Sequence, residues 1–86
     1  MNISRNEYRY DIPSIGQLIN VSVVGKHYCV SIAKMMLVDM ESLDHKLLGV
    51  PNRCAIDTIN NKIWFWPTPD KSYQVELVYF PPATKF

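Results

Sequence analysis

Four side chains in this sequence have the chemistry of metal ligands, or of a nucleophile and its base: His27, Cys29, His45 and Cys54. His27 and Cys29 are two residues apart, so on a strand they would project from the same face. The spacing contains neither a CxxC nor an HxxxH pair, and a lone cysteine in a strand usually packs as a small hydrophobe. No third residue that would orient a Cys–His pair can be named. We therefore expect no metal, no cofactor and no enzymatic activity.

Aromatic and basic residues in the second half of the chain suggest a different chemistry, the stacking of nucleic-acid bases. They are Trp64, Trp66, Tyr73 and Tyr79, with Arg53, Lys62 and Lys71 nearby. The formal net charge of only +1 argues against a basic binding face and against sequence-specific nucleic-acid recognition. A small single-stranded nucleic-acid-binding β-domain remains the alternative from a different functional class.

The elements that must position these residues belong to a single small domain. The chain has 86 residues, of which 48% are hydrophobic and 20% charged, enough to form a core. Charges interrupt the N-terminus where a signal peptide would be apolar, and no run approaches the ~18 apolar residues of a membrane span. Two cysteines are too few for a disulfide framework. We expect one domain over 1–86, no membrane contact, and free thiols in a reducing cytosol.

The first half predicts a hairpin over residues 17–32. Residues 17–24 are rich in β-branched side chains and would place Ile19, Val21 and Val23 on one face. Gly25-Lys26 would form a two-residue type II′ turn, in which Gly25 accepts a positive φ.

The next segment, 33–48, changes to three- and four-residue spacing and predicts a helix, either broken or in two pieces. Ser42 would cap a new turn, Gly49 would take the left-handed position after the helix, and Pro51 would prevent continuation. Met36 and Met40 are expected to fill the core beneath a sheet, or, with Met35, to form an adaptable docking surface.

Two further strands and a C-terminal strand complete the prediction. Residues 53–58 and 62–66 are separated by Asn60-Asn61, as in a hairpin, and 73–79 alternates cleanly. Between them, Pro67 to Asp70 predicts a rigid turn in which the Asp70 carboxylate accepts a backbone N–H and sets the register of 62–66 against 73–79. The fold class is therefore α+β and β-rich, with about five mostly antiparallel strands and a short helical segment between the second and third.

The order of these elements resembles that of the head-to-tail adaptor (connector) proteins of tailed bacteriophages. The resemblance rests on Gly49-Val-Pro51 before a strand, on the Pro67-Thr-Pro-Asp70 turn, and on the tyrosine-bearing strand that follows. Tyr10-Asp-Ile-Pro13 and the hairpin around Gly25 extend it to about residues 8–82, which leaves 1–7 as a predicted tail. The family usually flanks this β-module with helical segments. With few flanking residues here, we expect a shortened product, an excised module or a relative with another place in the virion.

The resemblance implies a non-enzymatic virion protein at the head–tail junction, assembled in the bacterial host cytoplasm. It implies a ring-like homo-oligomer, a dodecamer in this family, with portal and tail proteins as partners. Another phage tail or baseplate module is an alternative within the same class.

Four residues are candidates for subunit interfaces: Trp64, Trp66, Met35 and Phe80. Trp64 and Trp66 lie on one face of their strand, while Ile63 and Phe65 occupy the other, which we expect to pack with Val75 and Leu77. The tryptophans would then meet a neighbouring subunit or lie beneath the 33–48 helix.

Overall fold

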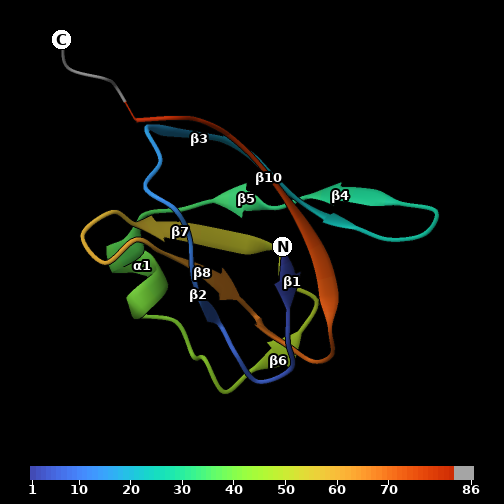
Figure 1. Ribbon diagram of the computed structural model, residues 1–86. Coiled ribbons are helices and arrows are strands. Elements are labelled where there is room, and N and C mark those ends of the chain that lie inside the picture. Colours follow the sequence, from blue (N-terminus) through green and yellow to red (C-terminus); the bar gives the residue numbers. More distant parts are fainter. Residues whose placement is uncertain (83–86) are drawn as a thin grey trace, which may run out of the picture.

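The computed structural model, which describes residues 1–82, consists of two four-stranded sheets that face each other across one core (Figure 1). Strands make up 49% of the chain and helix 6%, which confirms the predicted β-rich α+β class. The first sheet has the order β1 (Asn2–Ile3), β10 (Tyr73–Phe80), β3 (Gln17–Val24) and β4 (Cys29–Ser31). The second has the order β2 (Arg9–Asp11), β8 (Lys62–Trp66), β7 (Arg53–Asp57) and β5 (Ala33–Lys34). A small parallel pair joins β6 (Leu48–Gly49) to β9 (Thr68–Pro69).

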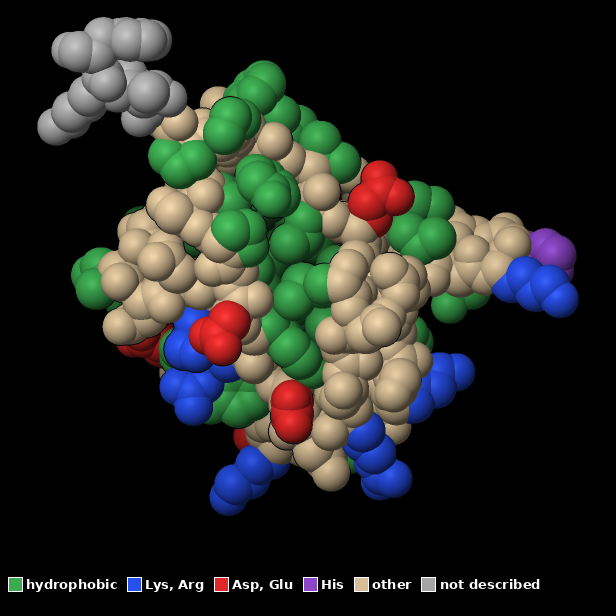
Figure 2. Space-filling view, viewed as in Figure 1, with side chains coloured by type: hydrophobic (Ala, Val, Ile, Leu, Met, Phe, Trp, Pro, Cys, Tyr) green, Lys and Arg blue, Asp and Glu red, His purple; other side chains and the backbone are tan. Residues whose placement is uncertain are grey.

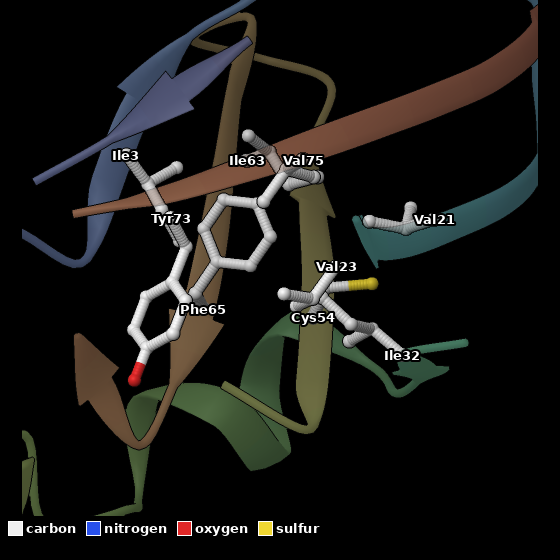
Figure 3. Close-up of a cluster of buried hydrophobic side chains, with 9 residues drawn as sticks. All are labelled: Ile3, Val21, Val23, Ile32, Cys54, Ile63, Phe65, Tyr73 and Val75. Carbon is white, nitrogen blue, oxygen red and sulfur yellow. The ribbon is translucent and has the colours of Figure 1, made fainter. Parts of the chain in front are cut away.

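The core lies between the two sheets, and both contribute strand residues of a single face. Figure 3 shows Phe65 and Ile63 of β8 among side chains of β3 and β10. Ile63, Phe65 and Val75 are fully buried, and Leu77 packs against them. The prediction that Ile63 and Phe65 turn inward is therefore confirmed.

The residues of β3 that face the core shift by one position along the strand. Val21 and Val23 are buried as predicted, but Ile19 is 40% exposed. Asn20 pairs with Val78 and Leu18 with Tyr79, so Ile19 is the extra residue of a β-bulge. Beyond the bulge Leu18 takes the core-facing position, which a strict period of two could not predict.

Residues 1–7, expected as a tail, are part of the fold. Ile3 in β1 is completely buried in the core cluster, and β1 pairs with the start of β10. The Met1 ammonium donates to the Val75 carbonyl at 2.7 Å. The tail prediction is wrong because a two-residue strand with one buried side chain leaves almost no periodic signal.

The β3–β4 hairpin is present, but its turn differs from the prediction. Val24 pairs with Cys29, so the loop contains four residues, closed by the Gly25 amide donating to the Tyr28 carbonyl at 2.8 Å. No glycine in the described chain has a positive φ. A Cβ at Gly25 would lie 2.1 Å from the Tyr28 ring, so glycine leaves room for that ring and does not supply a type II′ turn.

Most of the predicted helix over 33–48 is not helical. Ala33–Lys34 forms β5, parallel to β7, and α1 spans only Leu37–Glu41. The edge of β7 takes these residues into the sheet, so tertiary pairing overrides local period. No helix among residues 1–82 is long and apolar enough to cross a membrane.

The predicted capping residues also differ. Ser42 ends α1, and its hydroxyl donates to the Asp39 carbonyl at 2.7 Å. Gly49 is not left-handed: it lies in β6 and pairs with Pro69. Pro51 is buried just before β7, where Asn52 donates its amide to the Trp66 carbonyl.

The β7–β8 hairpin confirms the turn predicted at Asn60-Asn61. Asp57 pairs with Lys62, and Asn61 has a φ of 52°, in the left-handed region. The Asp57 carboxylate accepts the backbone amides of Ile59 and Asn60, and the Asn60 side chain, at 2.9–3.1 Å. These bonds lower the pKa of Asp57 below its usual value.

The Pro67–Asp70 segment has a different role from the one predicted. The Trp66–Pro67 peptide is cis, and the next two residues form β9. Asp70 accepts a bond from the Tyr73 hydroxyl at 2.5 Å, and not the predicted backbone bond. Strands β8 and β10 belong to different sheets, so the segment connects layers and sets no register between them.

We predict that Ile3→Ala lowers the free energy of unfolding by about 2–5 kcal/mol, because it leaves a cavity in the core cluster. Asn2→Ala, an exposed change in the same strand, is the control and should have little effect. Urea denaturation of both variants measures the difference. Equal midpoints would contradict the assignment of β1 to the core.

The buried Tyr73 phenol predicts a loss of stability at alkaline pH. Burial, together with the bond to Asp70, raises its pKa from 10.0 to about 12. A raised folded-state pKa favours the protonated form, so this stabilisation is complete below pH 10 and is lost as the pH rises toward 12. Thermal melts across this range should show the loss, and Tyr73→Phe should reduce the slope. Tyr79→Phe, at an exposed position, is the control and should retain it.

Candidate interaction surfaces

The outer face of β8 carries an aromatic cluster around Trp64. The Tyr8 ring stacks on His45 with centroids 4.2 Å apart, and both rings meet Trp64 edge-on at 5.6 and 5.7 Å. The Arg9 guanidinium lies 5.2 Å from the Tyr8 centroid and 5.3 Å from that of Trp64. Trp64 is therefore enclosed by residues of its own chain.

Trp66 is held by the loop that follows α1. Its Nε1 donates to the Asp44 carbonyl at 3.1 Å, while Thr68 donates its hydroxyl to the His45 carbonyl at 2.7 Å. Both tryptophans are half-buried. Of the two expected environments, a neighbouring subunit or the 33–48 segment, the geometry favours the second. The cover is the 42–47 loop and Tyr8, where a broken helix or two short helices were expected.

Two ring nitrogens in this cluster are buried without a hydrogen-bond partner among residues 1–82: Trp64 Nε1 and His45 Nδ1. His45 Nε2 lies 2.9 Å from the Met40 carbonyl, which can only accept, so Nε2 carries the proton. Nδ1 is buried and does not reach solvent. His45 therefore serves as a packing residue of this cluster.

Of the remaining candidate ligands, Cys54 lies in the second sheet, whereas His27 and Cys29 belong to the β3–β4 hairpin of the first. His27 is exposed in the β3–β4 loop, Cys29 is exposed on β4, and Cys54 is fully buried in β7. Burial raises the pKa of the Cys54 thiol to about 11, so it is not a nucleophile at neutral pH. Within residues 1–82 no three His, Cys, Asp or Glu side chains are grouped to hold a metal ion.

The β3–β4 hairpin projects from the body as an arm, defined here as residues 24–31 (Figure 1). Val30 is 57% exposed and Tyr28 53% exposed. Val30 pairs with the buried Val23 in the neighbouring strand. The side chains of Val23 and Val30 therefore lie on the same side of the first sheet, the side that faces the core. The arm extends past the second sheet, which leaves this face uncovered.

A second exposed apolar surface surrounds α1. Met36 and Val38 are 68% and 63% exposed, whereas Met40 is buried, so the expectation that both Met36 and Met40 fill the core holds only for Met40. Beside them is an open pocket of about 310 Å³, here called the α1 groove. Its apolar walls are formed by Leu18, Met35, Met36, Leu37 and Ile56. Met35, a predicted interface residue, lies in this wall.

The C-terminal end of β10 is the third such surface. Phe80, also a predicted interface residue, is 57% exposed, beside the exposed Val78 and Tyr79. These residues follow the bulge, where the β3–β10 ribbon leaves the core. Sequence periodicity missed the exposure of Tyr28, Val30 and Val38, because it reports which face a residue takes and not what covers that face.

Comparisons of the chain with protein-family models, with curated proteins and with solved structures found no match.

The same substitution at Trp64 and at Trp66 should lower the free energy of unfolding by different amounts. Trp66→Phe loses the bond to Asp44 and should destabilise the fold by about 0.5–1.5 kcal/mol more than Trp64→Phe, which removes a donor that has no partner. Trp64→Ala should cost about 3 kcal/mol, because the cluster with Tyr8 and His45 collapses. Urea denaturation measures all three. A folded monomer with unchanged stability in Trp64→Ala would instead favour the subunit-interface role.

Proposed function

We propose that this protein is a non-enzymatic structural subunit of a phage virion, similar to the head-to-tail adaptors, which joins portal and tail through subunit interfaces. The observation that carries the proposal is the number of large hydrophobic side chains left at the edges of a small domain. Among the described residues they are Ile19, Tyr28, Val30, Met36, Val38, Leu47, Leu48, Val50, Ile59, Val78, Tyr79 and Phe80. Where several of them gather, as on the β3–β4 hairpin, around α1 and at the end of β10, exposed apolar surface usually marks a protein contact.

The core itself supports the same proposal, because it is open on one side. Met1, Leu18, Ile56 and Leu77 pack against the buried cluster but remain partly exposed. Figure 2 shows hydrophobic side chains gathered in a hollow across the middle of this face. A small domain has limited apolar burial of its own, so contact with further subunits would add to its stability.

The charge of the chain also fits a place along a DNA channel. A net charge of +1 supplies few phosphate contacts, and a ring that lets DNA slide should avoid tight binding by counterion release.

The nucleic-acid alternative has less support from the aromatic residues. Base stacking requires open ring faces, whereas Tyr8 is stacked on His45 and Arg9 lies over both Tyr8 and Trp64. Tyr73 is buried in the core. Another tail or baseplate module would use the same exposed surfaces and remains the alternative within the structural class.

Sedimentation velocity over a wide concentration range tests the proposal. We expect the average mass to rise with concentration toward a discrete oligomer that appears as closed rings by electron microscopy. In parallel, the anisotropy of a labelled single-stranded oligonucleotide should show no salt-dependent binding. A monomer at every concentration would contradict the proposal, and salt-dependent binding of the oligonucleotide by that monomer would favour the nucleic-acid alternative. A portal, terminase or capsid gene beside the coding sequence would add independent support.

A further inference from the structure

The arm has an apolar face and an unpaired edge that its own chain does not use. Within residues 1–82, β4 is bonded on one side only, to β3, so its other edge is free. Tyr28 and Val30 remain more than half exposed on the uncovered face. Edge strands of this kind readily accept another chain.

The α1 groove is a concave apolar surface of suitable size for such side chains. It has a volume of about 310 Å³, and Met36 and Leu37 form its rim. Methionine side chains adapt their shape to what they contact, which suits a docking surface.

The arm and α1 lie on opposite sides of the molecule (Figure 1), and the groove is lined by Met36 and Leu37 at the start of α1. Because the core lies between the arm and α1, the arm of one chain cannot enter its own groove without unfolding. A contact between them must therefore join two copies head to tail. Contacts of this heterologous type generate closed rings or open filaments.

The tip of the arm and the exposed residues at the end of α1 carry charges of opposite sign. The arm contains no acidic residue, and Lys26 is exposed at its tip. Beside the groove, Asp39 and Glu41 are exposed. Lys34 also lines the groove, but its ammonium is bonded to the carbonyls of Leu18 and Ile19 at 3.2 and 3.1 Å.

We propose that the arm of one copy docks in the α1 groove of the next, with Tyr28 and Val30 against Met36 and Leu37 and with Lys26 near Asp39 and Glu41. This inference rests on the proposed self-association and names the surfaces that carry it. Gly25 helps to place the Tyr28 ring for this contact, because only a residue without a Cβ lets the ring lie against the loop.

Single substitutions on the full chain test the two surfaces. Val30→Ser on the arm and Met36→Ser at the groove should each weaken self-association by about fivefold or more in sedimentation velocity. Ile59→Ser is the matched control, because Ile59 is 90% exposed and lies in the distant β7–β8 turn. All three positions are exposed, so thermal melts should show that the monomers stay folded.

Mixing the two weakened variants tests the head-to-tail geometry. The Met36→Ser chain keeps an intact arm and the Val30→Ser chain an intact groove, so together they should form a one-to-one complex and nothing larger. Charge reversal gives a second test: Lys26→Glu and Glu41→Lys should each weaken association, and the double variant should recover part of the loss.

The outcomes separate this inference from the proposed function. If the unmodified chain forms oligomers that Val30→Ser, Met36→Ser and Lys26→Glu leave unchanged, the arm–groove contact is wrong and the structural role stands. If the unmodified chain remains monomeric at every concentration, the proposed function fails and the inference fails with it. Weakening by Ile59→Ser equal to that by Val30→Ser would also overturn the inference, because it would indicate unspecific apolar contact.

Discussion

The antiparallel pairing of β3 with β10 is the interaction on which the rest of this structure depends. It joins the first third of the chain to the last residues described, and its register aligns Val23 with Val75 and Val21 with Leu77. These residues form one wall of the core, against which Ile63 and Phe65 of the second sheet pack. The same seam holds β1, so the Met1 ammonium and Ile3 are positioned by β10. Loss of this pairing would remove both the core and the anchor of the N-terminus.

The strands of this seam are longer than the core that covers them, and the exposed surfaces follow from that difference. At one end, β3 continues into the arm, where Val30 pairs with Val23 but no longer faces the second sheet. At the other end, the bulge at Ile19 turns the ribbon so that Val78, Tyr79 and Phe80 leave the core. Six of the exposed apolar residues therefore lie where strand pairing continues and sheet-on-sheet packing stops: Ile19, Tyr28, Val30, Val78, Tyr79 and Phe80. A surface of this origin is well suited to contact with another subunit.

The second sheet is organised around β7 and β8, and its outer face is closed by the chain itself. The 42–47 loop brings His45 onto Tyr8 and Trp64, and the parallel pair of β6 with β9 ties this loop to the residues after β8. The tryptophans on the outer face of β8 are therefore largely covered by residues of the same chain, although the Trp-Phe-Trp pattern resembles that of an interface. This leaves the arm and the α1 groove as the better candidates for contacts between copies.

The sequence by itself determined the features that depend on neighbouring residues. Alternation at 62–66 and 73–79 predicted the inward residues, Asn60-Asn61 predicted the β7–β8 turn, and the strand patterns together predicted a β-rich domain. Tertiary structure decided what depends on distant partners. The edge of β7 took Ala33–Lys34 from the predicted helix, β10 recruited Asn2–Ile3 from the predicted tail, and the bulge opposite Val78 moved Ile19 outward. A short segment has only a weak intrinsic preference for helix or strand. Its conformation is therefore decided by the sheet edge or core cavity against which it packs. For the same reason the exposure of Val30 and Met36 could not be predicted, because it depends on where the opposing sheet ends.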